Sequence, residues 1–339
     1  MIDLLKKLCE INGTSGDEAR VADFITDNIA PKNAVIRRDS LGNILVFKKG
    51  KNTPQKVIMF AAHMDEVGFI VTDITKSGFL KFSVVGGITP DVVFGRRVKF
   101  NNGVTGVIAG KPVHLLNKKE SDIQPKTDDL FIDICAADKA ESEKHISPGD
   151  FCYFTNGFDE LNNDIIRAKA VDDRLGCAIM LDMLKSELEY DCVFAFTVQE
   201  EIGCRGAAAA AFNLEPDICI VLEATTACDI AGVSDNEAVC RLYDGPVISF
   251  MDKGTIYDRE LYDITMKTAK ENGLKAQTKS RIVGGNDGGV IHKTVGGIRT
   301  IAISAPCRYI HSPFCIVSKN DIHEMRVLVD KLLCKFAIL

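Results

Sequence analysis

The chain has 339 residues, of which 46% are apolar, so it can build one large domain or two moderate ones around a complete core. Lys and Arg number 41 against 47 Asp and Glu, giving a net charge of -6 without a block of like charge, and we expect no nucleic-acid partner. No stretch approaches the roughly 20 apolar residues that cross a bilayer, so we expect no membrane partner either.

The start of the chain is predicted to be an amphipathic helix followed by a capping box from Ser15 to Glu18, rather than a secretory leader. The 12 cysteines are dispersed, and no two are spaced C-x-x-C. Several, such as Cys192 and Cys219, lie inside apolar runs. We interpret them as buried thiols in a reducing compartment and expect a cytoplasmic protein.

Apolar segments of strand length alternate with helical patterns along much of the chain. The strand-like segments are residues 56–62, 192–198, 218–222 and 299–304, and the helical patterns are residues 174–188 and 260–273. This alternation is typical of an α/β fold. The segment AAAAAF at 207–212 is predicted to begin a packed helix.

Between about residues 67 and 165 the pattern changes to short strand-like segments separated by Gly, Asn, Pro and Asp. This pattern indicates a small β-barrel or sandwich. Because candidate site residues lie on both sides of it, we expect an insertion. The predicted division is a discontinuous catalytic domain, residues 1–66 and 166–339, and an inserted β-rich domain, residues 67–165.

Five residues of metal-ligand type lie at or after the ends of apolar segments: His63, Asp172, Glu201, Glu223 and His311. In α/β folds, ligands gather beyond the carboxyl ends of the strands. Two divalent cations carry four positive charges, and three carboxylates together with one hydroxide cancel them. The two neutral imidazoles then complete the coordination of the metals without adding charge. A carboxylate between the metals can bridge them. The order therefore predicts a two-metal hydrolase.

Two further carboxylates have predicted roles beside these ligands. Glu200 is left uncoordinated and can move protons, and it points away from Glu201 if both follow an extended strand. Asp65, two residues after His63, can accept the proton of the ring nitrogen that faces away from metal.

Each motif also has a simpler interpretation when taken alone. The H-x-D pattern is common, and adjacent aspartates before a helix can serve as an N-cap, which suits Asp173 better than Asp172. The glutamates could be solvated residues at strand ends. Cys204 and Cys307 lie beside the motifs, but the set of oxygen and imidazole ligands is complete without them.

Taken together, the motifs resemble those of the M42 family of co-catalytic metallo-aminopeptidases over nearly the whole chain. They are, in order, AAHMDEVGF, AVDDRLG, VQEEIGCRGA, LEATTACD, GGNDGGVIH and RYIHSP. The resemblance implies a three-layer α/β/α catalytic domain of the co-catalytic zinc peptidase type with an inserted β-barrel-like dimerisation domain. It also implies an aminopeptidase that removes N-terminal residues from short peptides.

By this resemblance, each subunit holds two divalent metal ions, Zn²⁺ in the first place, with Co²⁺ or Mn²⁺ as alternatives. One ion is held by His63, Asp172 and Glu223, and the other by Asp172, Glu201 and His311. Glu200 is the general base, and Asp65 supports His63. The resemblance further implies a homo-oligomer, in which dimers assemble into a twelve-subunit tetrahedral shell that admits peptides and not folded proteins.

The chain departs from the family pattern at two places. Glu223 stands where many members carry an aspartate. In GGNDGGVIH, Asn286 and Gly288 flank Asp287 in place of a threonine-like residue and an alanine. Because the second place lies near the substrate pocket of the family, the resemblance does not supply a preferred N-terminal residue.

Three alternative functions remain at this point. M20-like peptidases or deacylases share the ligand types, but their extra domain follows the fourth ligand, whereas here the insertion follows the first. A glycoside hydrolase of the endoglucanase type could use the adjacent acids, yet the chain has no Trp and 7% aromatic residues, and sugar sites favour aromatic platforms. A non-catalytic assembly module is the third alternative, and the intact Glu200 argues against it.

Overall fold

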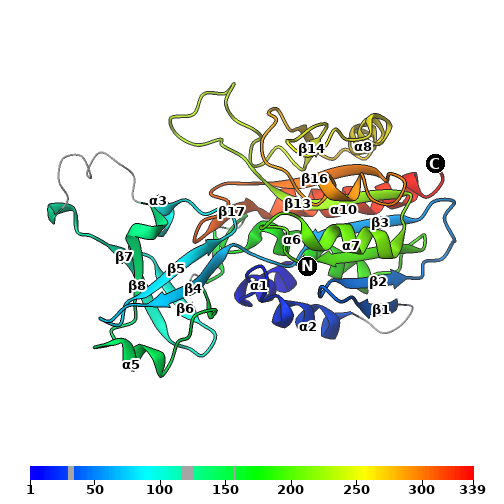
Figure 1. The fold of residues 1–339 in the computed structure, drawn as a ribbon. Helices are drawn as coiled ribbons and strands as arrows, with labels where there is room; N and C mark the ends of the chain where they lie inside the picture. The colour runs from blue at the N-terminus through cyan, green and yellow to red at the C-terminus, as the bar shows by residue number, and fades with distance from the viewer. Residues whose placement is uncertain (30–33, 116–125, 156, 163) are drawn as a thin grey trace.

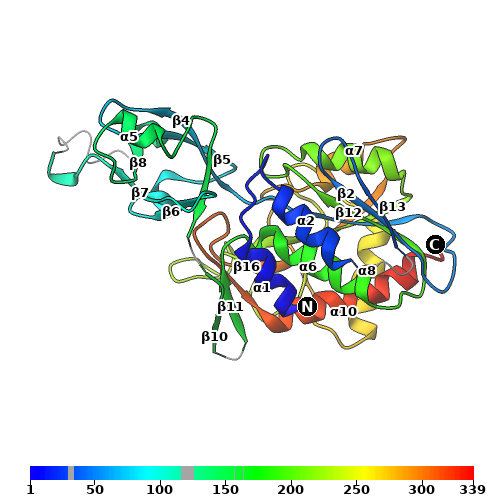
Figure 2. The same ribbon diagram turned by 90° about the horizontal axis from the view of Figure 1, so that it is seen from below.

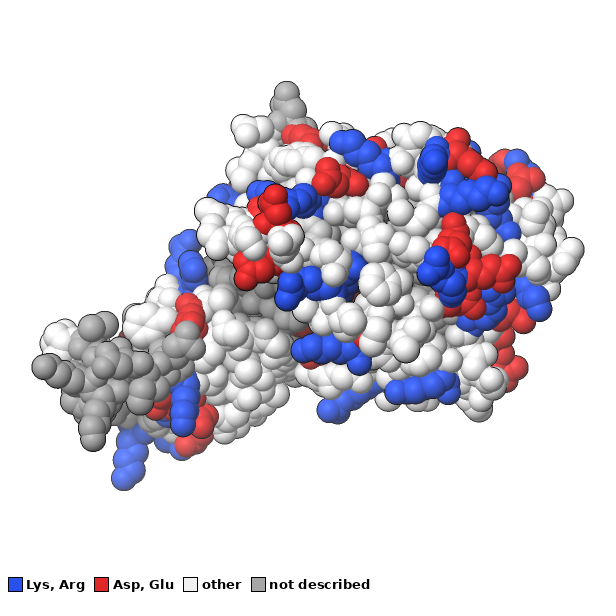
Figure 3. Space-filling model, turned by 90° about the horizontal axis from the view of Figure 1, so that it is seen from above, with Lys and Arg blue, Asp and Glu red and all other residues white. Residues whose placement is uncertain are grey.

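The computed structural model describes residues 1–29, 34–115, 126–155, 157–162 and 164–339. Figure 1 shows a larger α/β part, which contains both termini, beside a smaller β-rich part. In the described part of the chain, no helix is both long and apolar enough to cross a membrane. On the face shown in Figure 3, basic and acidic side chains are interspersed over the α/β part rather than gathered by sign.

The larger part is built on an eight-stranded sheet. Its strands lie side by side in the order β1 (Ala34–Arg38), β2 (Ile44–Lys48), β12 (Cys192–Thr197), β3 (Ile58–His63), β13 (Ile218–Thr226), β16 (Arg299–Cys307), β14 (Val247–Ser249) and β15 (Gln277–Thr278). The four strands from β12 to β16 are parallel, whereas β2 and β14 pair antiparallel with them. Every residue of β3 and β12 is buried, which explains their continuous apolar sequences.

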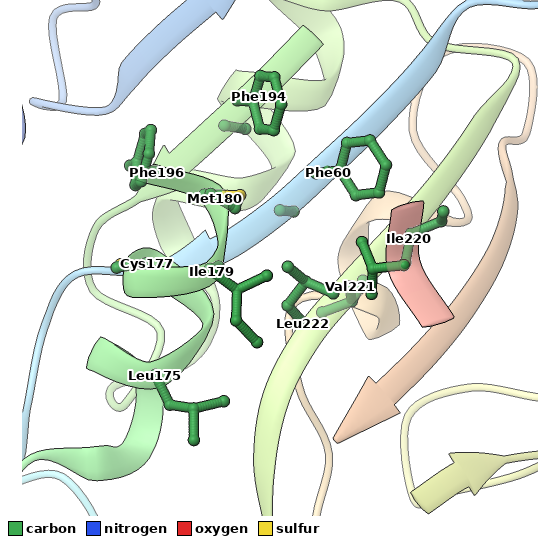
Figure 4. Packing of buried hydrophobic residues seen from close by; sticks show 14 of the residues in the cluster. Phe60, Leu175, Cys177, Ile179, Met180, Phe194, Phe196, Ile220, Val221 and Leu222 are labelled. Carbon is green, nitrogen blue, oxygen red and sulfur yellow. The ribbon is translucent and has the colours of Figure 1, made fainter. Parts of the chain in front are cut away.

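Helices cover both faces of this sheet, and the three-layer arrangement is confirmed. They are α1 (Ile2–Glu10), α2 (Ala19–Asn28), α6 (Val171–Lys185), α7 (Arg205–Leu214), α8 (Arg259–Glu271), α9 (Gly288–Ile291) and α10 (Lys319–Phe336). Figure 2 shows the sheet between α7 on one face and α1, α6 and α10 on the other. In the core, Ile179 of α6 lies toward Leu222 of β13 (Figure 4).

The smaller part is a closed barrel, as the sequence predicted. Its strands follow one another around the barrel as β4 (Gly68–Ile74), β5 (Leu80–Val85), β8 (Leu130–Asp133), β7 (Thr105–Gly110), β6 (Arg97–Phe100) and β9 (Phe151–Phe154). Short helical turns interrupt the loops: α3 (Pro90–Val93), η1 (Val113–Leu115), η2 (Thr127–Asp129) and α5 (Lys139–Glu143). The barrel has its own core, in which Phe69 meets the rings of Phe82 and Phe154 edge to face.

A three-stranded sheet follows the barrel in the chain. In it, β11 (Ile165–Ala168) lies between β10 (Asp159–Leu161) and β17 (Cys315–Ser318). The chain therefore enters the barrel directly after β3 and leaves it through a hairpin that pairs with a C-terminal strand. We propose the division into residues 1–66 and 166–339, the catalytic part, and residues 67–165, the inserted part, with the boundary at the start of β11.

Candidate functional site

The five predicted ligands converge on one cavity of about 760 Å³ at the carboxyl ends of the parallel strands. His63 is the last residue of β3, and Asp172 lies in the first turn of α6. Glu201 lies in the turn after β12, and His311 lies in the loop after β16. Glu223 was predicted to follow its strand, but β13 continues to Thr226, so this glutamate projects from the strand itself.

Asp172 lies between the two histidines and faces each with a different oxygen. Its Oδ1 is 3.5 Å from Nε2 of His63, and its Oδ2 is 3.3 Å from Nε2 of His311. Glu223 Oε2 is 3.8 Å from the His63 nitrogen. Glu201 Oε2 is 3.2 Å from the His311 nitrogen. The side chains thus form two groups that share Asp172.

These residues offer the donors that a divalent cation requires. Oδ1 of Asp172 and Oε1 of Glu223 are buried without a hydrogen-bond partner among the described residues, and such carboxylate oxygens are costly to bury unless a cation meets them. Donor atoms of His63, Asp172 and Glu201 lie within 4.8 Å of one another. Imidazole and carboxylate ligands in this number suit Zn²⁺ or a similar ion. The residues present therefore fit a metal centre.

Asp173 also lies at this centre, which the sequence did not indicate. One of its donor atoms lies within 4.8 Å of donor atoms of His63 and Glu223, and no described residue forms a hydrogen bond with its buried Oδ2. Its Oδ1 accepts the N–H of Gly176 at 2.9 Å, the contact of a residue that caps a helix. The capping role explains why an aspartate stands here, and only the folded arrangement brings this residue beside the centre.

The pKa values of the site reflect crowded charges. Burial raises the pKa of Glu200 to about 8. Burial would also raise the pKa of Asp172, but the adjacent imidazoles of His311 and His63 outweigh it and lower that pKa. In turn, the carboxylates overcome burial and raise the pKa of His311 to about 11. The imidazole protons balance the carboxylates here, and a bound cation would replace those protons.

Asp65 connects His63 to the turn that carries both glutamates. Its carbonyl oxygen lies 3.1 Å from Nδ1 of His63. Its carboxylate accepts the backbone N–H of Glu200 at 3.0 Å and that of Glu201 at 3.1 Å. Opposite directions were predicted on the condition that both glutamates follow an extended strand, but β12 ends at Thr197 and they lie in this turn. The turn and Asp65 therefore determine their directions, rather than strand alternation.

Two supporting residues were not found from the sequence. Nδ1 of His311 lies 3.2 Å from the carbonyl oxygen of Gly87, which belongs to the barrel part. That carbonyl can only accept, so it orients the ring with Nε2 toward Asp172 and Glu201. Ser15, predicted to begin a capping box with Glu18, instead donates its hydroxyl proton to Asp65.

Three lysines line the same cavity: Lys253, Lys279 and Lys293. The side chain of Lys279 is 7% exposed, and among the described residues no carboxylate lies at ion-pair distance from it. Burial lowers its pKa, although Asp252, Glu223 and Asp172 lie near enough to oppose that shift. A nearly buried ammonium group that faces a cavity indicates a place for an anionic group.

Comparison with known proteins gives consistent matches over the whole chain. Residues 42–328 match the family model described as M42 glutamyl aminopeptidase. A putative aminopeptidase of Acetivibrio thermocellus is 39% identical and covers 98% of each chain. The glutamyl aminopeptidase of Lactococcus lactis is 33% identical, covering 95% of this chain and 92% of that protein. Among solved structures, the TET1 peptidase of Pyrococcus horikoshii superposes with a TM-score of 0.85, at 33% identity and with 98% of each chain covered. That peptidase is described as able to assemble into a tetrahedron or a large octahedral shell.

Proposed function

We propose a two-metal mechanism for this chain, which belongs to the M42 glutamyl aminopeptidase family and is a peptide hydrolase. One cation would be held by His63, Asp172 and Glu223 and the other by Asp172, Glu201 and His311. We propose Zn²⁺ as the metal, with Co²⁺ or Mn²⁺ as alternatives. The observation that carries this proposal is Asp172, which faces one imidazole with each of its two oxygens.

When bound, the two cations would lower the pKa of the attacking water and polarise the first peptide carbonyl. We assign Glu200 the movement of protons, because it lines the cavity and belongs to neither group of ligands. Its Oε2 lies 3.9 Å from Nε2 of His63, beside the metal centre. Glu200 would take the proton of the water and give it to the leaving amine. Burial raises its pKa to about 8 without cations. Cations bound beside it would lower that pKa toward neutrality, where a carboxylate can both accept and donate a proton.

We further propose that the enzyme prefers peptides with an acidic N-terminal residue. Cations at the centre would neutralise Asp172 and Glu223, so that Lys279 loses two of the negative charges that now offset the cost of burying its ammonium group. A carboxylate on the N-terminal side chain would then pair with the Lys279 ammonium group inside the cavity. The glutamyl aminopeptidase among the relatives supports this choice.

The barrel and the cysteines support two finer proposals. We propose that subunits form dimers through residues 67–165 and that dimers build a twelve-subunit shell, in line with the tetrahedral assembly described for the TET1 peptidase. Light scattering that finds only a monomer would contradict this. We also propose a cytoplasmic location, since the cysteines of the chain are free thiols and most are buried.

The test of the mechanism is Glu200→Gln, which keeps size and shape and removes the base. We expect kcat to fall by roughly 10² to 10⁴ while elemental analysis finds the metal content of the unaltered enzyme. Glu201→Gln is the matched control one residue away, and it should instead lower metal content. Unchanged turnover in Glu200→Gln with metal retained would refute the role of Glu200.

A peptide panel separates the remaining functions. Metal-stripped protein, restored with Zn²⁺, Co²⁺ or Mn²⁺, is assayed on short peptides that begin with Glu, Asp, Leu or Lys, each free or N-acetylated. We expect metal-dependent release from free N-termini only, and fastest from Glu and Asp. Release from acetylated peptides would favour the M20-like deacylase instead.

A further inference from the structure

We propose that Glu200, Cys204 and Asp287 form a second cation site, which takes a thiophilic divalent ion such as Zn²⁺ or Cd²⁺ and inhibits the enzyme. None of the five predicted ligands belongs to it. The binding of the cation depends only on these three side chains. The inhibition rests on the proposed function, because it assumes that Glu200 moves protons during catalysis.

The three side chains are already gathered around one point. A carboxylate oxygen of Glu200, the Sγ of Cys204 and a carboxylate oxygen of Asp287 lie within 4.8 Å of one another. The Sγ atom is 3.5 Å from Oε1 of Glu200. Ligands at usual Zn–S and Zn–O distances around a tetrahedral ion lie about 3.6 Å apart, so this pair already has the required spacing.

Asp287 supplies a second and independent indication of a ligand. Its side chain is fully buried at the start of α9. Oδ2 accepts the hydroxyl proton of Thr197 at 2.5 Å, which fixes the carboxylate, while Oδ1 is buried and meets no hydrogen-bond partner in the part of the chain that the structure describes. An orphaned buried carboxylate oxygen carries a large desolvation cost, which a cation at this point would remove.

The donor types define which cations fit. One sulfur and two carboxylate oxygens favour borderline or soft ions, whereas Mg²⁺ and Ca²⁺ prefer oxygen alone. Cys204 is the residue that precedes α7. Burial and the carboxylates of Asp287 and Glu200 raise the pKa of its thiol, so the thiol stays protonated until a cation displaces the proton. On binding, the thiol would release its proton to solvent as the S–metal bond forms. Both Cys204 and Glu200 line the cavity, so the ion can enter from the substrate side.

Occupation of this site and catalysis exclude each other. A Glu200 carboxylate that coordinates a cation cannot accept a proton from water or pass it to the leaving amine. The enzyme should therefore be activated by the first two equivalents of Zn²⁺ and inhibited by more. Such a response would link peptide hydrolysis to the concentration of free zinc.

The binding test uses protein loaded with two equivalents of Zn²⁺ per subunit and titrated with Cd²⁺. The predicted catalytic ligands contain no sulfur, so a thiolate-to-metal charge-transfer band in the ultraviolet reports only a cysteine site. We expect a band that saturates at one further equivalent. It should be lost in Cys204→Ser, which keeps a hydroxyl donor to Glu200, and weakened in Asp287→Asn. Cys228→Ser is the matched control, because Cys228 lines the same cavity outside the cluster, and it should keep the band.

The inhibition test compares each variant with its own activity at two equivalents of Zn²⁺. For the unaltered enzyme and Cys228→Ser, we expect activity to fall as Zn²⁺ increases further and to return after mild chelation. For Cys204→Ser, half-inhibition should need at least an order of magnitude more Zn²⁺. A band that survives Cys204→Ser, or no band at all, would overturn the cation site. A normal band without inhibition would overturn only the inhibitory role and would count against Glu200 as the base.

Discussion

The hydroxyl of Ser15 donates a hydrogen bond to Oδ2 of Asp65 at 2.6 Å. The same oxygen accepts the N–H of Glu201, so the loop between α1 and α2 supports the turn that carries the two glutamates. Glu18 adds a second connection, since its Oε1 accepts the N–H of Gln199 at 3.1 Å. The first loop of the chain therefore contributes to the position of the candidate site without reaching it.

Asp65→Asn should test this support. The amide keeps the shape of the carboxylate but replaces one acceptor oxygen with an NH₂ group, which would face a backbone N–H. The carboxylate also lies beside the metal-binding histidine, since Oδ1 of Asp65 is 3.4 Å from Nδ1 of His63. We expect kcat to fall by roughly 10 to 100-fold, the usual cost of changing such a partner. Steady-state kinetics and metal content measure the effect. Ser15→Ala should lower kcat less and in the same direction, and an Asp65→Asn enzyme with normal kcat would contradict the supporting role.

The sequence predicted the parts of this molecule that depend on local patterns. Helices cover both faces of the sheet, so β3 and β12 are buried on both sides. Strands buried in this way consist of continuous apolar residues, and such runs can be recognised in the sequence. The barrel was predicted from short strands separated by turn residues. His63 and His311 were chosen as ligands by residue type and order, and the structure brings them to opposite sides of Asp172.

The sequence failed where a contact depends on distant segments. Nothing near Ser15 indicates Asp65, and nothing near Gly87 indicates that its carbonyl orients His311. The directions of Glu200 and Glu201 were predicted by strand alternation, but a turn that begins after Thr197 determines them. Lys279 carries no local signal either, because its role follows from burial beside a cavity that other segments enclose.

Lys279→Met should change substrate preference. The methionine keeps much of the apolar stem and removes the ammonium group. We expect the ratio of kcat/KM for Glu against Leu substrates to fall by about 10 to 100-fold, since a hydrogen bond to a charged group contributes about 1.5 to 3 kcal/mol. Aryl-amide substrates measure this ratio, because they lack the C-terminal carboxylate that could also pair with lysine.

Lys253→Met is the control at an exposed position of the same cavity, where solvent weakens an ion pair with the substrate and the ratio should change little. An unchanged ratio in Lys279→Met would exclude an acidic preference through this residue.

Arg174→Lys should destabilise the α/β part strongly. The Arg174 side chain is fully buried, and its guanidinium donates to four backbone carbonyls, those of Leu8, Ile11, Gly13 and Met64. A lysine ammonium group donates from one point and cannot reach all four, so some of these buried carbonyls lose their hydrogen-bond partner. We expect a loss of about 3 to 5 kcal/mol in the free energy of unfolding.

Urea unfolding of metal-free protein measures this loss. Arg167→Lys is the matched control, because Arg167 pairs with Asp159 in an exposed position and should change stability by less than about 0.5 kcal/mol. Equal unfolding midpoints for the two variants would show that the buried guanidinium is not needed.

Asp229→Asn should make stability less dependent on pH. Burial alone would raise the pKa of Asp229, but the Arg308 guanidinium, at 2.7 and 2.8 Å, and the N–H of Leu242 outweigh it and hold that pKa below its usual range. A carboxyl group with a lowered folded-state pKa stabilises the protein above its unfolded-state pKa of about 3.9, and this contribution is lost as pH falls through the folded-state value. We expect Asp229→Asn to lower the free energy of unfolding by only about 1 to 2 kcal/mol at pH 7, because Arg308 is partly exposed and solvent weakens the pair.

The measurement is the free energy of unfolding of metal-free protein as a function of pH. The difference between Asp229→Asn and the unaltered chain should shrink between about pH 5 and pH 3. Asp235→Asn removes an exposed partner of Arg241 and should show almost no difference at any pH, whereas a constant difference for Asp229→Asn would mean that its charge is not the cause.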